Sequence, residues 1–263
     1  MPRPVVVGLD GSRESLAAAD WAAREALRRG LPLRLVHAYE GLPSDGSDLP
    51  ELEAPRYWAR RILRGAMDRL DERYPQVRLS ADQVARPAAQ ALVTAGANAE
   101  LLVLGSRAFS GLGGFMAGSV ASATVAHVTR PVVLVRAGQT PADERVPDGE
   151  GRPSAREPYR EVVVGVDTGH PCEEVLEFAF ESAALRNAPL RVVHAWHLPD
   201  DADAAAREAA GEALAALVRP WREKFPAVPV RELTENGRPA QVLLRATAEA
   251  GLLVVGRRTR PSS

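Results

Sequence analysis

The stretch Leu101–Ser119 reads LLVLGSRAFSGLGGFMAGS, and it decides how the surrounding sequence folds. Its first four residues form a short apolar run that ends at Gly105, which is typical of a buried parallel strand. Ser119 begins an Ala- and Val-rich segment, as expected of a helix N-terminus. Between them lies a glycine-rich loop, which lets a ligand approach the backbone while the free N–H groups of the helix start face it. The stretch therefore predicts a phosphate site.

Upstream and downstream of this stretch, strand-like and helix-like segments alternate. Short apolar runs predict further strands at Val5–Asp10, Leu33–Ala38, Val77–Val84 and Pro131–Val135. Helical periodicity predicts helices at Ser15–Arg29, Glu51–Tyr74 and Ala88–Asn98 and after Ser119. The expected buried face of the second of these helices is Trp58, Ile62, Leu63, Met67 and Leu70. This alternation predicts an open parallel sheet covered by helices on both faces.

The ligand of such a sheet lies beyond the carboxyl ends of the strands, where the strand order reverses. Asp10, Ala38 and Gly105 all stand at predicted strand ends, so the sequence predicts that they line one crevice. His37 stands next to one of these ends. We expect it to be a packed, hydrogen-bonded histidine, because no other residue of ligand type has metal-site spacing beside it.

The second half of the chain repeats the first. Val162–Asp167 matches Val5–Asp10 and Leu190–Ala195 matches Leu33–Ala38, both at an offset of 157 residues (165 − 8 and 194 − 37). Two matches in register indicate tandem homologous domains. Between the copies, residues 139–158 are rich in Pro, Gly and charged residues and predict a linker.

The expected organisation is therefore a domain at residues 1–138, a linker at 139–158 and a second domain at 159–263. The second domain is expected to be incomplete. After Gly256 the sequence shows no counterpart of the glycine-rich loop, the last helix or the last strand. Asp167, which matches Asp10, is accordingly expected to have a structural role, and the second domain is expected to bind no nucleotide of its own.

The amino-acid composition indicates which kinds of partner and which compartment to expect. The net charge is −1, from 33 basic and 34 acidic residues, which gives no support for a nucleic-acid partner. The single cysteine, Cys172, allows no intrachain disulfide and suits a reducing compartment. Neither a signal peptide nor a membrane-spanning apolar stretch is evident, so we expect no membrane partner and a cytoplasmic location.

With these motifs in hand, the chain resembles a tandem universal stress protein. The resemblance rests on VVVGLDGS at Val5–Ser12, LVHA at Leu35–Ala38, and the loop pattern G-x2-G-x9-G-[ST]. That pattern falls on Gly105, position 108, Gly118 and Ser119, and position 108 departs from it as Ala108. The resemblance implies an α/β fold of two tandem open parallel-sheet domains, Rossmann-like and of the adenine nucleotide alpha hydrolase type, the second incomplete.

The resemblance also implies a ligand, which is ATP, alone or with Mg²⁺. Asp10 would hydrogen-bond the ribose, the backbone of Ala38 would meet the adenine edge, and the loop and helix start would surround the phosphates. Ten positions are assigned to nucleotide binding in this way: Leu9, Asp10, Ala38, Leu104, Gly105, Arg107, Ala108, Gly118, Ser119 and Val120. Plainer alternatives remain open at this point: Asp10 as a cap of the following turn, Arg107 as a solvated loop residue, and the loop as a structural turn.

Catalysis has little support in the sequence. There is no G-x-x-x-x-G-K-[ST], no G-x-G-x-x-G after the first strand and no G-x-S-x-G. The expected function is an ATP-binding regulatory module of the stress response. The alternatives are a slow ATPase or adenylate-processing enzyme of the same fold, and a scaffold that binds no nucleotide.

An assembly is also expected. In relatives, the fifth strands of two domains pair edge to edge, and here only the strand Pro131–Arg136 is present. An apolar strand at a sheet edge presents unpaired N–H and C=O groups to another chain. The sequence therefore predicts a homodimer through this strand, since a two-fold interface is the commonest homo-oligomeric arrangement.

Overall fold

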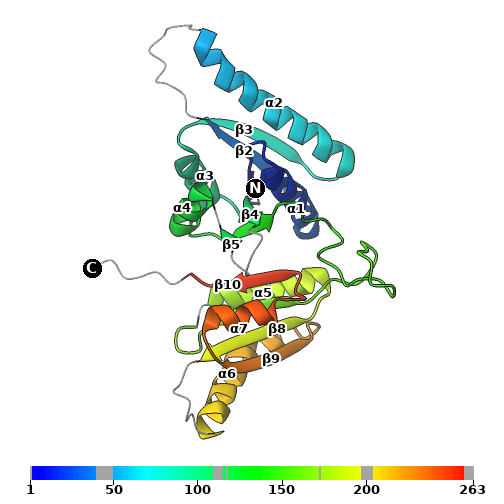
Figure 1. The fold of residues 1–263 in the computed structure, drawn as a ribbon, viewed down its shortest axis with the longest axis vertical. Helices are drawn as coiled ribbons and strands as arrows, with labels where there is room; N and C mark the ends of the chain where they lie inside the picture. Colours follow the sequence, from blue (N-terminus) through cyan, green and yellow to red (C-terminus); the bar gives the residue numbers. More distant parts are fainter. Residues whose placement is uncertain are drawn as a thin grey trace, which may run out of the picture. The chain divides into compact units, whose positions relative to one another are not determined.

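The computed structural model describes residues 2–39, 50–108, 115–116, 118–171, 173–196 and 204–257. The chain divides into two compact units, Met1–Thr140 and Pro141–Ser263. Each unit is a parallel sheet with helices packed on both of its faces (Figure 1). The predicted α/β class with two tandem open sheets is therefore confirmed.

The sheet of the first unit has the strand order β3-β2-β1-β4, with β6 on the far side of β4. These strands are β1 (Val5–Gly8), β2 (Leu33–Tyr39), β3 (Leu79–Ala85), β4 (Leu101–Ala108) and β6 (Val132–Arg136), all parallel. A short strand, β5 (Phe115–Met116), pairs antiparallel with the end of β4. The chain runs from β1 outward to β3 and then returns beside β1 at β4. The point where the strand order reverses therefore lies between β1 and β4.

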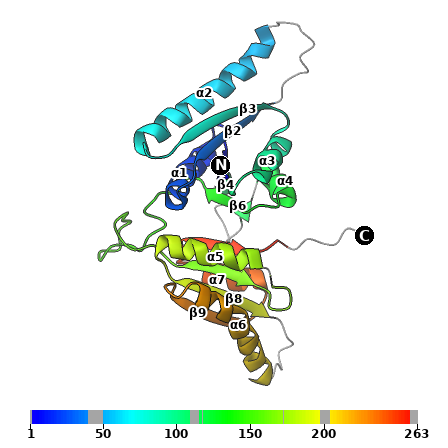
Figure 2. The same ribbon diagram turned by 180° about the vertical axis from the view of Figure 1, so that it is seen from behind.

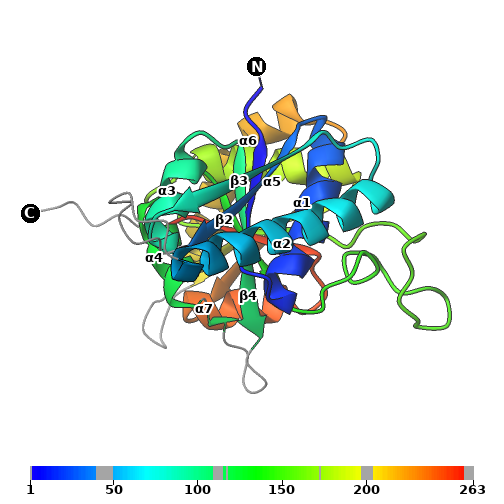
Figure 3. The same cartoon turned by 90° about the horizontal axis from the view of Figure 1, so that it is seen from above.

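Four helices cover this sheet. α1 (Arg13–Arg29) and α2 (Pro50–Arg73) pack on one face, and α3 (Ala88–Ala97) and α4 (Ser119–His127) pack on the other (Figure 3). The start of α1 is fixed by Ser12, whose side chain accepts a hydrogen bond from the N–H of Ser15 at 3.1 Å. Its end is fixed by Gly30, whose φ of 64° is a left-handed conformation that glycine adopts readily.

The predicted buried face of α2 is partly wrong. Leu63 and Leu70 are buried as predicted, together with Ala59 and Ala66, whereas Trp58 is 56% exposed. The buried positions form a strip at spacings of three and four residues, which faces β2 and β3. Trp58 precedes this strip by one residue and therefore lies about 100° around the helix.

The second unit repeats this arrangement with four strands. They are β7 (Val162–Val166), β8 (Leu190–Trp196), β9 (Val230–Asn236) and β10 (Leu252–Val255), in the order β10-β7-β8-β9. α5 (Glu173–Arg186) and α6 (Ala204–Lys224) pack on one face and α7 (Pro239–Ala246) on the other (Figure 2). The core between α5 and α6 contains the stacked rings of Phe180 and Trp221, whose centroids are 5.8 Å apart.

Part of the segment expected to be a linker has structure of its own within the second unit. Arg145 and Tyr159 form an antiparallel bridge, and the Arg145 guanidinium lies 3.9 Å from the Tyr159 ring centroid. The N–H of Arg160 donates to the carbonyl of Glu144 at 2.9 Å. In the part of the chain that the structure describes, none of the helices has the length and apolar character needed to cross a membrane.

Candidate functional site

The carboxyl ends of β1, β2 and β4 meet at one edge of the first sheet. Gly8 lies opposite Val36 of β2, and Val7 lies opposite Val103 of β4. The N–H of Leu9 continues the β1–β2 ladder by donating to the carbonyl of Val36 at 2.8 Å. Beyond these pairs the three strands lead directly into Asp10, Ala38 and the Gly105 region. The structure therefore brings these predicted site residues to the same edge, beside the reversal in strand order.

Asp10 occupies an exposed turn between β1 and α1. Its Oδ1 accepts hydrogen bonds from the N–H of Ser12 at 2.9 Å and from the Ser12 hydroxyl at 2.5 Å. Partial burial raises the pKa of Asp10, but the hydrogen bonds from Ser12 and Ser15 together outweigh it and lower the pKa below its ordinary value. The side chain is therefore an ionised acceptor at neutral pH, and it also stabilises the turn.

His37 supports the same turn from the neighbouring strand. Its Nδ1 lies 2.7 Å from the carbonyl oxygen of Leu9, so Nδ1 carries the proton and donates it. His194 makes the equivalent contact in the second unit, with Nδ1 3.2 Å from the carbonyl oxygen of Val166. The expectation of a packed, hydrogen-bonded histidine agrees with this geometry. The sequence did not indicate that His37 would bond to Leu9, the residue that precedes Asp10.

The two outer glycines of the loop pattern have different surroundings. A Cβ at Gly105 would lie 2.5 Å from the carbonyl carbon of Glu14 and 2.7 Å from the nitrogen of Ser15. Glycine at this position is therefore required for the first turn of α1 to pack against β4. At Gly118, by contrast, φ is −57° and a Cβ would meet nothing within 4 Å among the described residues.

Gly118 is the N-cap of α4, and it has no side chain with which to cap the helix. No acidic residue occupies the first turn, and Ser119 and Val120 are exposed. The free N–H groups of this turn and the positive end of the helix dipole are therefore open to an anion. Among the described residues, neither backbone conformation nor packing requires glycine at position 118, whereas the close approach of a ligand would.

The remaining predicted site residues lie around this edge. Leu9 and Leu104 are buried, and Ala38 is half-buried. Arg107 and Ala108 extend β4 and pair with β5. Gly111, Gly113 and Gly114 lie outside the described residues.

In the second unit, Asp167 stabilises its own turn. Its Oδ1 accepts from the N–H of Gly169 at 3.0 Å, and its Oδ2 lies 3.4 Å from Nδ1 of His170. The described residues from 141 to 257 include no helix that follows β10 as α4 follows β4. The uncapped helix start that α4 provides in the first unit therefore has no counterpart in this part of the second unit.

Both units are similar to members of one protein family. The model of the universal stress protein family matches residues 1–136 and 158–262. A universal stress protein of Mycobacterium tuberculosis is 32% identical over 268 residues, covering 96% of this chain and 86% of the relative.

Two solved structures are similar to this chain over different lengths. A universal stress protein from Archaeoglobus fulgidus shares the fold, with a TM-score of 0.64 at 16% identity over 94% of this chain and 83% of its own. A universal stress protein crystallised with cAMP covers 52% of this chain and 98% of its own at 29% identity, with a TM-score of 0.39.

Proposed function

Because the chain belongs to the universal stress protein family, we propose that its first unit binds an adenine nucleotide where β1, β2 and β4 end and α4 begins. The observation that carries the proposal is Gly118, at a helix start with no side-chain cap, where neither conformation nor any described neighbour requires glycine. We further propose that the protein acts as a nucleotide-dependent binding module of the stress response, in which occupancy of this edge changes the surface offered to a partner.

The residues at the edge suit the parts of such a ligand. The ionised carboxylate of Asp10 accepts hydrogen bonds from ribose hydroxyl groups. The backbone of Ala38, at the end of β2, offers a donor and an acceptor to the adenine edge. The first N–H groups of α4 and the Ser119 hydroxyl are suited to phosphate oxygens. ATP is the nucleotide that we propose, alone or with Mg²⁺.

Two hydrogen bonds hold the turn at this edge in place. Asp10 is held by Ser12, and His37 donates its Nδ1 proton to Leu9. These contacts fix the turn that faces the nucleoside, so its shape is set before a ligand arrives. A preorganised turn lowers the entropic cost of binding.

Isothermal titration calorimetry of the full chain with ATP, ADP and AMP tests the proposal. Replacing Gly118 with Val puts a branched side chain where the phosphates approach, and we expect binding to weaken at least tenfold. Gly149→Val is the matched control, because a Cβ there also meets nothing within 4 Å and the residue lies in the other unit. Wild-type protein that gives no heat with any of the three nucleotides would refute the proposal, as would unchanged binding by Gly118→Val.

A further inference from the structure

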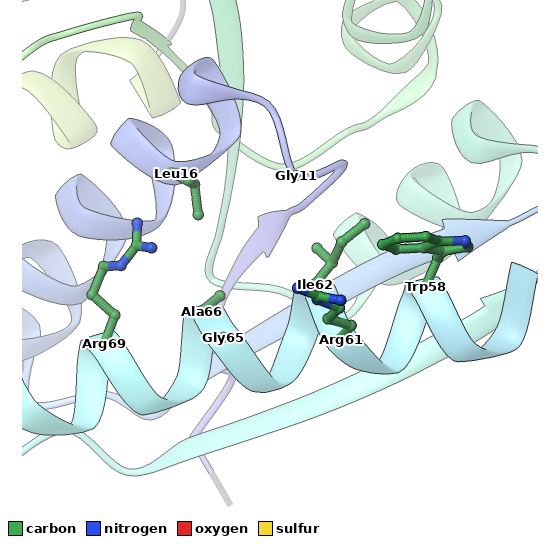
Figure 4. Close-up of a pocket in the computed structure, with 8 residues that line it drawn as sticks. All are labelled: Gly11, Leu16, Trp58, Arg61, Ile62, Gly65, Ala66 and Arg69. Atoms are coloured by element: carbon green, nitrogen blue, oxygen red, sulfur yellow. The ribbon is translucent and has the colours of Figure 1, made fainter.

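A cavity of about 240 Å³ lies beside the turn between β1 and α1, on the side of α2 (Figure 4). It is distinct from the edge described above, because most of its wall comes from α2. The residues of α2 that line it are Trp58, Arg61, Ile62, Gly65, Ala66 and Arg69, and the opposite wall is Gly11 and Leu16.

The floor of the cavity is apolar and long. Ile62 points toward Gly11 and Leu16 reaches in from α1, while Ala66 is buried beneath them (Figure 4). Trp58 and Arg69 stand at the two ends (Figure 4), eleven residues apart on one helix and hence about 16 Å apart along its axis. The cavity is therefore a groove, and it suits an extended ligand better than a compact one.

The groove carries positive charge that the described residues do not neutralise. Arg69 has no ion pair with any acidic side chain described in the structure, and Arg61 has only its contact with the Trp58 ring, at 5.5 Å from the centroid. Arg73 on the same helix, by contrast, pairs with Asp20 at 2.9 Å. A guanidinium group beside an apolar floor provides a fixed site for an anionic head group.

Gly65 gives the groove an open floor at its centre. A Cβ at this position would meet nothing within 4 Å, so packing in the described structure does not require glycine. Glycine in the middle of a helix also lowers helix stability relative to alanine. The absence of a side chain leaves the helix backbone open to direct contact with a ligand.

We propose that this groove binds an elongated apolar molecule with one anionic head group, a medium-chain carboxylate. The carboxylate pairs with Arg69, the one of the two groove arginines that has no aromatic contact, and the chain lies over Gly65 and Ile62 toward Trp58. The ring of Trp58, which is mostly exposed in this structure, then covers the end of the chain. The proposal is independent of nucleotide binding, because none of the predicted nucleotide-binding residues lines the groove.

Calorimetric titration of the full chain with octanoate, hexanoate and octan-1-ol tests both halves of the proposed ligand. Octanoate should bind roughly fifteenfold more tightly than hexanoate, because it buries two more methylene groups, each worth about a factor of four. Octan-1-ol should bind at least tenfold more weakly than octanoate, because it cannot form the charged pair. Equal affinities for octanoate and octan-1-ol would overturn the proposal, and so would the absence of octanoate binding.

Three variants locate the ligand. Arg69→Gln should weaken octanoate binding about tenfold by removing the charge. Gly65→Leu should abolish binding by filling the groove, while circular dichroism shows an intact helix because the space at this position is open. Arg64→Gln, an exposed arginine of α2 outside the groove, is the matched control and should bind octanoate like the wild type. Wild-type affinity in Gly65→Leu would place the ligand elsewhere and contradict the proposal.

A competition experiment separates this groove from the nucleotide site. Saturating AMP should leave the Kd for octanoate unchanged, whether or not AMP itself binds. Displacement of octanoate by AMP would show that the groove is part of the nucleotide site, and the proposal of a separate ligand would fail.

Discussion

At the scale of single residues, Asp10 performs two tasks with one carboxylate. It accepts two hydrogen bonds from Ser12, which hold the turn after β1, and it remains exposed at the edge where the nucleotide is proposed to bind. The alternative interpretation of Asp10 as a turn cap is thus compatible with a contact to ribose. The lowered pKa links the two tasks, because the same hydrogen bonds keep the carboxylate charged.

The stability of the fold should depend on pH through the ionisation of Asp10. Because its folded pKa is lower than its unfolded pKa, it stabilises the fold above the unfolded value of about 3.9, and this contribution disappears as the pH falls through the folded pKa. Ser12→Ala should raise the pKa of Asp10 toward its ordinary value, and its urea unfolding midpoint should depend less on pH in this range. An NMR titration of the Asp10 carboxyl measures the shift directly. An unchanged pKa in Ser12→Ala would show that the hydrogen bonds from Ser12 are not its cause.

At the scale of elements, the contact between α1 and β4 depends on Gly105. The first turn of α1 lies so close to β4 that a methyl group at position 105 would overlap backbone atoms of Glu14 and Ser15. The sequence assigned Gly105 to the phosphate site. The structure adds a packing requirement to that assignment.

Alanine substitutions at Gly105 and Gly118 test whether glycine is needed for packing at the first position and not at the second. Gly105→Ala should lower the free energy of unfolding by about 1–3 kcal/mol, as overpacked sites do. Gly118→Ala should lower it by less, at most about 1 kcal/mol, because nothing described lies within 4 Å of the new methyl group and only the N-cap preference for glycine over alanine is lost. Urea unfolding followed by tryptophan fluorescence measures both, since Trp21 of α1 is buried in the same unit. Equal effects at the two positions would contradict the distinction between them.

Local sequence signals predicted most of these elements, because an apolar run marks each strand and helical periodicity marks each helix. The predicted helix Ser15–Arg29 lies within α1 and ends at the same residue, and the apolar runs that predicted β1 and β2 contain buried residues. The extension of β4 to Ala108 could not be predicted in this way, because it depends on antiparallel pairing of Arg107 with Met116 and of Ala108 with Phe115, which no apolar run or turn motif in the sequence indicates. The exposure of Trp58 was missed for a similar reason, since it depends on how α2 is rotated against the sheet.

At the scale of the whole molecule, β6 is an edge strand. Among the described strands of the first unit it pairs only with β4. The N–H of Leu102 donates to the carbonyl of Pro131, and the N–H of Ala137 donates to the carbonyl of Ser106. Because donors alternate along a parallel strand, the N–H of Val133 also faces β4, while the N–H of Leu134 faces away from β4. In a homodimer through this strand, the backbone N–H of Leu134 would therefore donate to the second chain.

We propose that this edge pairs with the same strand of a second chain, and light scattering should then show a dimer. Leu134→Pro should dissociate it by removing the outward donor. Leu134→Ala is the control, because it loses the same side chain and keeps the N–H, so it should remain dimeric. A monomeric wild type, or a dimeric Leu134→Pro variant, would exclude this interface.

The most direct test of the central claim is the number of nucleotides bound per chain. Equilibrium dialysis of the wild-type protein against labelled ATP and AMP measures this number at saturation. The account predicts one, because the first unit joins the strand ends to an uncapped α4, whereas the described part of the second unit has no such helix. A value of zero for both nucleotides would contradict the claim of nucleotide binding, and a value of two would contradict its assignment to the first unit alone.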